Sequence, residues 1–121
     1  MLRLTLFAAL VALPAQAFTA SNDLRVQPTG PVTFTVPYQN NVAPEAFWCA
    51  AGDYVVFNLR KRGDTPIYRA SPVPRRSGEG IAFSLSPSNP VGKTGLVLLG
   101  GDPGYITAAL AQALCDSMDH H

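Results

Sequence analysis

Apolar and polar side chains alternate in two segments of the chain, Val32–Val36 and Ile81–Leu85. A period of two puts neighbouring residues on opposite faces of an extended chain, so each segment is predicted to form a half-buried strand. Another strand, over 24–27, precedes the turn Pro28-Thr29-Gly30-Pro31, which is rich in turn-forming residues. The strands over 24–27 and 32–36 are therefore expected to pair as an opening hairpin.

Two more strands are expected in the second half of the chain. Thr65–Ala70 is predicted as a strand entered through Pro66, and Leu96–Leu99 is a continuous apolar run that ends at Gly100-Gly101. A short apolar run bounded by glycines is typical of a strand buried on both faces. Residues 18–23 are small and polar, and we expect them to form a loose leader.

The first helix is predicted to begin at Pro44 and Glu45, where a missing N–H costs little and a carboxylate meets the positive helix end. Its apolar residues recur at helical spacing: Trp48, Ala51, Val55 and Leu59. We expect Trp48, the only tryptophan, to be buried between this helix and the sheet. The cationic run that ends in Gly63 indicates its last turn and its stop. Gly52 is less favourable than alanine inside a helix by about 1 kcal/mol. A break after Gly52 is therefore the alternative.

The second helix is predicted to begin at Asp102-Pro103, a capping carboxylate followed by proline at the first helical position. One set of apolar residues fits a single helical face: Ile106, Ala109, Leu110, Ala113 and Leu114. This spacing predicts that the face of these five residues packs on the core.

The two cysteines lie among small residues on the two predicted helices. Gly52 follows Cys49 by about one helical turn, and Ala111 precedes Cys115 by one turn. Small residues let helix backbones approach closely, and a disulfide needs Cα atoms about 5.5 Å apart. Two cysteines in a small secreted domain usually pair, so a Cys49–Cys115 disulfide is expected. Two free thiols or an intermolecular bridge are the alternatives.

The predicted elements follow the order ββ-α-ββ(β)-α. Such an order predicts an α+β fold, in which an antiparallel sheet carries both helices on one face. The Cys49–Cys115 bridge would link these helices to each other. Patterns of this kind do not specify the order of the strands in the sheet.

Residues 1–17 have the pattern of a secretory signal peptide. Arg3 supplies the positive charge, Leu4–Leu13 is the apolar run, and Ala15-Gln16-Ala17 is the small-x-small pattern that signal peptidase recognises. The apolar run is shorter than the ~18 residues that a spanning helix needs, and no later run approaches that length. Cleavage before Phe18 would place the protein in an oxidising compartment, either periplasmic or secreted, without a transmembrane segment.

The processed chain, residues 18–121, has a length suited to one small domain. Loss of Arg3 leaves eight Lys and Arg against eight Asp and Glu, so the net charge is about zero. A neutral domain has no overall field that attracts polyanions. Nucleic acid is therefore not an expected partner.

Three segments together resemble a known family: Trp48-Cys49-Ala50-Ala51-Gly52-Asp53-Tyr54, Ile81–Leu85, and Ala113-Leu114-Cys115. The family consists of small, uncharacterised secreted proteins from alphaproteobacteria. The resemblance covers most of the processed chain, and the first segment is its most specific part. It implies a shared scaffold, and it implies no activity and no site residues.

Few side chains have the spacing that catalysis or cofactor binding requires. The only histidines, His120 and His121, end the chain, whereas nucleophilic hydrolysis needs a positioned base. Gly92-Lys93-Thr94 has Pro87 where a phosphate-binding loop needs glycine. The tail over 116–121 contains ligand types that suit copper or zinc, but a free tail does not hold them in place. No cofactor and no metal are expected.

Basic residues gather in the middle of the chain. Residues 60–76 contain six of them, against Asp64 alone. Arginine dominates this segment, and arginine favours bidentate contacts with carboxylate or phosphate groups. The candidate binding residues are its five arginines: Arg60, Arg62, Arg69, Arg75 and Arg76. We expect them to lie along one edge of the domain, either as a site for an anionic partner or as a solvated rim balanced by the acidic tail.

These observations favour a non-enzymatic extracytoplasmic binding or interaction module, whose arginine-rich edge meets an anionic envelope component or protein. One alternative is a small extracytoplasmic enzyme that uses Asp53, Tyr54 and the arginines. Another is a structural envelope protein. A concave pocket that holds Asp53 would favour the enzyme, and an arginine-edged surface would favour the binding module.

The exported protein should begin at Phe18, because Ala15-Gln16-Ala17 places small residues at the two positions that signal peptidase reads. N-terminal sequencing of protein from the periplasm or the medium measures this directly. Ala17→Leu should block cleavage, whereas Gln16→Leu, at the position that is not read, should be processed normally. An exported chain that still begins at Met1 would contradict the prediction.

Overall fold

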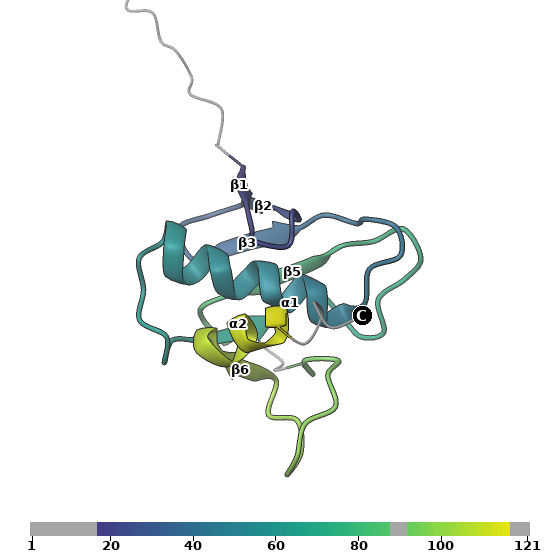
Figure 1. Ribbon diagram of the computed structural model, residues 1–121. Coiled ribbons are helices and arrows are strands. Elements are labelled where there is room, and N and C mark those ends of the chain that lie inside the picture. The colour runs from purple at the N-terminus through teal and green to yellow at the C-terminus, as the bar shows by residue number, and fades with distance from the viewer. Residues whose placement is uncertain (1–16, 88–91, 117–121) are drawn as a thin grey trace, which may run out of the picture.

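The computed structural model describes residues 17–87 and 92–116. Within these ranges the chain forms a sheet and two α-helices (Figure 1). The strands are β1 (Phe18–Thr19), β2 (Arg25–Pro28), β3 (Thr33–Val36), β4 (Pro66–Arg69), β5 (Ile81–Ser84) and β6 (Tyr105–Thr107). The helices are α1 (Pro44–Asp53), a π-helix (Tyr54–Asn58) that continues it, and α2 (Ala108–Asp116). The apolar run of the predicted signal peptide and residues 117–121 of the tail lie outside the described residues.

The six strands form one antiparallel sheet in the order β1-β2-β3-β5-β4-β6. β2 and β3 make the predicted hairpin, with Gln27 opposite Thr35. The chain then crosses the sheet through α1 and returns in β4, which leaves room for β5 to pair between β3 and β4. Both helices lie on the same side of the sheet (Figure 1), so the predicted α+β fold is confirmed.

The core lies between α1 and the inner face of the sheet. Trp48 is completely buried, as expected for the only tryptophan on the predicted first helix. Its ring meets the ring of Phe83 edge to face, with centroids 4.8 Å apart. Phe34 stacks on Phe83 at 5.6 Å and touches Tyr54 at 4.6 Å. Aromatic rings from two strands and one helix therefore form a continuous cluster, which holds α1 on the sheet.

The two α-helices pack through small residues. A Cβ atom added to Gly52 would lie 2.8 Å from the Cβ of Ala111 and 2.9 Å from the carbonyl oxygen of Ala108. This close approach brings the Cα atoms of Cys49 and Cys115 to 4.9 Å, and the two residues form a disulfide. The predicted bridge is confirmed. Because it joins residues 66 positions apart, it stabilises the fold by about 4 kcal/mol in the chain-entropy model.

The first helix neither breaks after Gly52 nor continues to Arg62, so both predictions for its end are wrong. Gly52 is tolerated because the absence of a side chain leaves the space in which α2 packs. After α1 the chain widens into the π-helix, in which the N–H of Leu59 donates to the carbonyl of Tyr54 at 3.0 Å. Arg60 then takes a left-handed conformation, with φ of 58°, which is a common way for a helix to end.

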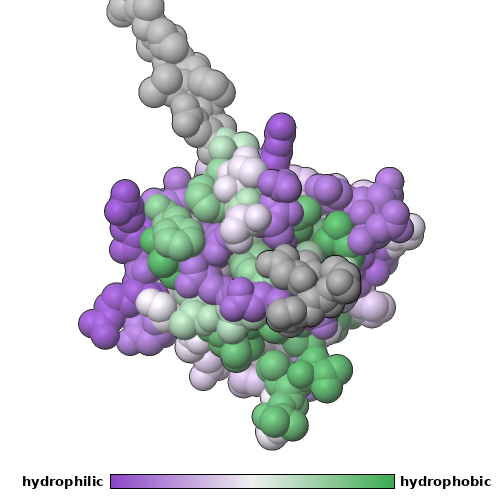
Figure 2. Space-filling model, viewed as in Figure 1, coloured by the Kyte–Doolittle hydropathy of each residue, from purple (hydrophilic) through white to green (hydrophobic). Residues whose placement is uncertain are grey.

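Leu96–Leu99 does not form the predicted buried strand. Val97 and Leu99 are fully exposed, at 100% and 102%, and the segment is a loop that projects from the body of the protein. The projection is the green protrusion at the bottom of Figure 2. The last strand is β6 instead, which occupies residues that were predicted to begin the second helix. An apolar run shows that contact of a segment with water is unfavourable, but it does not show whether the rest of the fold covers that segment.

The second helix begins at Ala108, five residues after Pro103, which was predicted as its first residue. The hydroxyl of Thr107 accepts a hydrogen bond from the N–H of Leu110 at 3.2 Å and so caps the helix. The buried face of α2 is also opposite to the predicted one. Ala108 and Ala111 are buried, whereas Leu110 is 46% exposed. The small-residue face is the buried one because only small side chains fit against Gly52.

The N-terminal leader is partly ordered as a strand, contrary to expectation. Phe18 in β1 pairs with Val26 in β2. Its ring lies edge-on to Tyr54 with centroids 5.7 Å apart, which gives the strand an apolar contact beyond its own hairpin.

Gly52→Ala should destabilise the protein, although alanine is the better helix former by about 1 kcal/mol. Two of the atoms that the new Cβ would meet, the oxygen of Ala108 and the nitrogen of Gln112, belong to the backbone and lie at 2.9 Å. Overpacking of this kind typically costs ~1–3 kcal/mol, so the midpoint of urea unfolding should fall.

The matched control is Gly63→Ala, because its Cβ would lie at 3.2 Å from the side chain of Ala109. This contact is less tight, and the urea midpoint should change less than in Gly52→Ala. A Gly52→Ala protein that is more stable than the wild type would contradict the packing described for the two helices.

Candidate anion-binding site

Arg69, the last residue of β4, is buried, with 4% of its surface exposed. Its guanidinium donates to three backbone carbonyls: Nε to Ser71 at 3.0 Å, Nη2 to Pro72 at 2.9 Å, and Nη1 to Thr94 at 3.3 Å. A guanidinium has five N–H groups, so these bonds leave donors unused. In the part of the chain that the structure describes, no carboxylate forms an ion pair with Arg69. Among the described residues, carbonyl dipoles are thus the partners that stabilise its positive charge.

Thr94 connects Arg69 to α1 and to the loop before β6. Its carbonyl oxygen accepts from Arg69 and also from Nε1 of Trp48, at 3.2 Å. Its N–H and its hydroxyl donate to Oδ2 of Asp102 at 2.9 and 2.8 Å. Asp102 therefore holds the residue whose carbonyl binds both Trp48 and Arg69.

Asp102 was predicted to cap the second helix, and this prediction is wrong. Its Oδ1 instead accepts from the N–H of Gly104 at 2.9 Å, and both of its oxygens accept from Thr94. Burial raises the pKa of Asp102, but hydrogen bonds from Gly104, Thr94 and Gly95 outweigh that effect. The net result is a pKa below its ordinary value, because these donors stabilise the ionised carboxylate.

Arg75 reaches the same region from the loop between β4 and β5. Its Nη1 donates to the carbonyl of Glu79 at 2.9 Å. The guanidinium lies over the ring of Phe47, 4.9 Å from the centroid, and 5.7 Å from that of Tyr38. These cation–π contacts orient the side chain. Its Nε is buried and has no hydrogen-bond partner in the described structure.

Arg69 and Arg75 line one pocket of about 360 Å³. Its other lining residues are apolar or glycine: Pro44, Val73, Pro74, Ile81 and Gly95. Desolvation lowers the pKa of Arg69, and the positive charge of Arg75 lowers it further, as expected for two cations that line the same pocket. The volume lies in the range of small-molecule sites. The pocket thus joins two cations and contains no carboxylate among its lining residues.

The structure does not bring all five candidate arginines together. Arg60 and Arg62 follow the C-terminal end of the π-helix, whereas the pocket includes Pro44, the first residue of α1. The helical segment between them is about 20 Å long. Arg62 is exposed and pairs with the exposed Asp64 at 3.5 Å. The expected single edge is therefore divided between the two ends of the helix.

Arg76 is also outside the pocket. Its side chain is exposed, and its backbone N–H donates to Oε1 of Glu79 at 3.3 Å. Of the five candidate arginines, the pocket includes Arg69 and Arg75.

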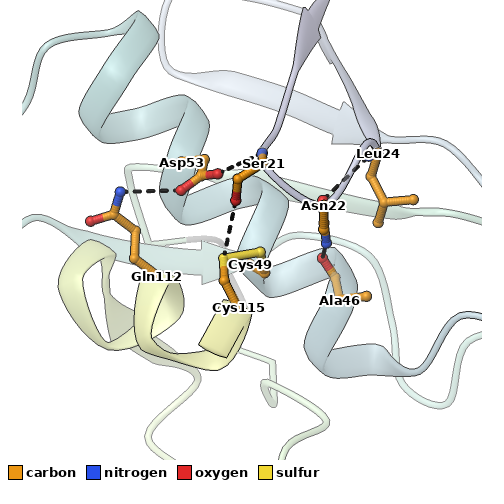
Figure 3. The surroundings of a disulfide bond; sticks show 8 residues. All are labelled: Ser21, Asn22, Leu24, Ala46, Cys49, Asp53, Gln112 and Cys115. Atoms are coloured by element: carbon orange, nitrogen blue, oxygen red, sulfur yellow. Dashed lines mark hydrogen bonds between the residues drawn. A yellow bond between two sulfur atoms is a disulfide. The ribbon is translucent and has the colours of Figure 1, made fainter. Parts of the chain in front are cut away.

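Asp53, the candidate catalytic carboxylate, is bound within the protein beside the disulfide (Figure 3). Its Oδ2 accepts from the N–H of Ser21 at 2.8 Å, and its Oδ1 accepts from Nε2 of Gln112 at 3.2 Å. Figure 3 shows these donors arriving from the turn after β1 and from α2. Tyr54 is buried against Phe34. Asp53 therefore joins three segments, namely α1, the turn after β1, and α2.

Cys49, Asp53 and Cys115 place their possible ligand atoms within 4.8 Å of one another. Both sulfur atoms are joined in the disulfide, however, and metal ions bind the thiolate form of cysteine. The oxidised protein therefore has no thiolate to offer at this cluster.

The sequence contains a signal for the inward position of Arg69. Arg69 lies two residues after the buried Ile67 on β4, so both point to the core face of the strand. An arginine at an inward strand position is a buried cation, which needs polar partners and often has a role beyond packing. The contact of Asp102 with Thr94 has no comparable local signal.

Comparison with protein-family models, with curated proteins and with solved structures found no match. The resemblance to secreted alphaproteobacterial proteins therefore stays a prediction.

The stability of the protein should fall as the pH drops below about 4, in part because of Asp102. Its pKa is lowered in the folded state, so its contribution is present above the pKa of the unfolded chain, about 3.9, and is lost as the pH falls through the folded value. Asp102→Asn should lower stability at neutral pH and weaken the pH dependence. Urea unfolding at neutral and acidic pH measures both effects.

The control for this experiment is Asp64→Asn, which changes an exposed carboxylate paired only with an exposed arginine. Its pH dependence should run parallel to that of the wild type. If Asp102→Asn also runs parallel to the wild type, the hydrogen bonds of Asp102 do not have the role assigned to them.

Proposed function

We propose that this protein is a non-enzymatic extracytoplasmic binding module, whose pocket between Arg69 and Arg75 takes a carboxylate- or phosphate-bearing partner. The observation that carries the proposal is the presence of two arginines, and no carboxylate, among the lining residues of one pocket. Arginine is the side chain best suited to bidentate contacts with these anions.

The energetics of the pocket favour an anion. Two neighbouring cations raise each other's free energy, and an anion between them removes that repulsion.

The shape and lining of the pocket restrict the ligand. A volume of about 360 Å³ suits one small group or the end of a longer chain. Val73, Pro74 and Ile81 add an apolar wall beside the two charges. The partner is therefore an anionic group next to an apolar one, such as the end of an envelope component or of a protein chain.

The extracytoplasmic location rests on the signal-peptide pattern and on the disulfide, because disulfides persist in oxidising compartments. Among the helices of the described residues, none is long and apolar enough to cross a membrane. The compartment proposed is therefore the periplasm or the medium.

The enzyme built on Asp53, Tyr54 and the arginines is the weaker hypothesis. Asp53 ends α1 and Pro44 begins it, so the carboxylate lies about 13 Å along the helix from the wall of the arginine pocket. Both oxygens of Asp53 already accept hydrogen bonds from the protein. A carboxylate in that position binds segments together and does not meet the arginines.

An anion that occupies the pocket should raise the thermal midpoint of the wild type by several degrees, since a ligand at a hundredfold excess over its Kd stabilises by about 2.7 kcal/mol. Arg75→Ala should abolish this shift. Arg75→Lys should retain part of it, because lysine keeps the charge but lacks the planar guanidinium that makes bidentate contacts. A thermal-shift screen with inorganic phosphate, citrate, phospholipid headgroups, acidic glycans and peptides with a free C-terminal carboxylate measures the effect.

Arg76→Ala is the matched control, because it removes the same charge from the neighbouring exposed position. Its response should equal that of the wild type. Arg69 is not the residue to change first, since its loss would break three hydrogen bonds to the backbone. If no anion shifts the wild type, or if Arg75→Ala responds as the wild type does, the binding function is wrong and a structural role becomes the better hypothesis.

A further inference from the structure

The loop Leu96–Leu99 forms an apolar ridge on the surface of the protein. Val97 and Leu99 are exposed over their whole area, so no described part of the chain covers them. Glycines with positive φ bound the ridge, Gly95 on one side and Gly100 on the other, at 82° and 84°. Figure 2 shows the ridge as a hydrophobic projection. Large aliphatic side chains that stand together in water mark an interaction surface.

A hollow of about 800 Å³ lies beside the ridge. Val97, Leu98 and Leu99 form one of its walls. Its lining also includes residues of β6 and α2, among them Tyr105 and Leu110, whose side chains are partly exposed. One surface therefore carries an apolar projection and an apolar depression next to each other.

Charged side chains are few on this surface, and those that line its cavities are acidic. Asp102 lines the hollow, and its carboxylate accepts hydrogen bonds from Thr94 and Gly104. Glu45, at the start of α1, lines a neighbouring cavity together with Val97 and Leu110. Acidic side chains do not attract an anionic membrane surface. Loops that enter anionic bilayers are commonly flanked by several lysines or arginines, and the only basic residue close to the ridge in the sequence is Lys93. The fitting occupant is uncharged, apolar and proteinaceous.

We propose that two copies of this chain associate through this surface about a twofold axis, with Val97 and Leu99 of each copy seated in the hollow of the other. A twofold interface uses the same patch on both copies, so that patch must carry both complementary shapes. The ridge and the hollow meet this requirement, and the small number of charged side chains limits the repulsion between two identical patches.

The position of β6 supports this arrangement. It is the last strand in the order of the described sheet, so its outer edge has no described strand beside it. Such an edge exposes N–H and C=O groups that pair readily with another chain. Because Val97 and Leu99 do not line the arginine pocket, the association does not depend on the proposed anion binding.

Sedimentation velocity of the exported protein, over about 1 µM to 1 mM, tests the proposal. The wild type should form a dimer. Leu99→Asp should raise the dissociation constant of the dimer about 100-fold or more, because a twofold interface contains each substitution twice and loses the burial of two aliphatic side chains. Phe57→Asp is the matched control, since Phe57 is 59% exposed and outside the hollow, and its dimer should persist.

A photo-crosslinking residue at position 97 identifies the contact directly. Its crosslink should join two copies and map to the segment 105–110 of the second copy. Near-UV circular dichroism shows whether each variant keeps the native fold. Leu99→Ser, which adds no charge, is the second variant if Leu99→Asp does not fold.

Three results would overturn the proposal. The first is a wild type that stays monomeric over the whole concentration range. The second is a dimer that Leu99→Asp and Leu99→Ser leave unchanged. The third is a monomer that floats with vesicles of phosphatidylcholine and phosphatidylglycerol and loses this ability in Leu99→Asp, which would make the ridge a membrane-inserting loop.

Discussion

The close contact between α1 and α2 is the constraint on which the rest of the structure depends. The helices approach until a Cβ on Gly52 would collide with the backbone of α2, and only at that separation do Cys49 and Cys115 come within reach of each other. The glycine and the disulfide are therefore two parts of one requirement. Asp53 extends the same contact to a third segment, because it accepts from Ser21 in the turn after β1 and from Gln112 in α2.

This contact lies toward one end of α1, and the candidate site lies at the other. From the first turns of the helix, Phe47 supplies the ring under Arg75, and Trp48 donates to the carbonyl of Thr94 that also binds Arg69. One rigid helix thus connects the contact that holds the fold to the walls of the arginine pocket. Arg75 reaches the pocket from a loop, where its guanidinium contacts Phe47 and the carbonyl of Glu79. Arg69 is fixed more firmly, because it donates to three backbone carbonyls of the surrounding loops.

The sequence predicts most of the sheet, because alternation and turn residues are local signals that tertiary contacts seldom override. It also predicts the disulfide and the burial of Trp48. Small residues near both cysteines favour close packing of the helices, and a large aromatic side chain on a helix is usually buried. It does not predict the partners of Arg69 and Asp102, which depend on a carbonyl and a hydroxyl brought close only by the fold. The exposed ridge is missed for a related reason: hydropathy is a property of Leu96–Leu99 alone, while burial depends on what lies next to it.

The second helix shows how the fold and the apolar surface follow from one choice. α2 has two apolar faces, one of small residues and one that includes Leu110. Hydropathy favours the larger face for the core, but the space beside Gly52 admits only the smaller one. Ala108 and Ala111 therefore turn inward, and Leu110 turns outward beside Val97 and Leu99. The same packing that permits the disulfide thus leaves an apolar surface on the outside, which no described part of the chain covers.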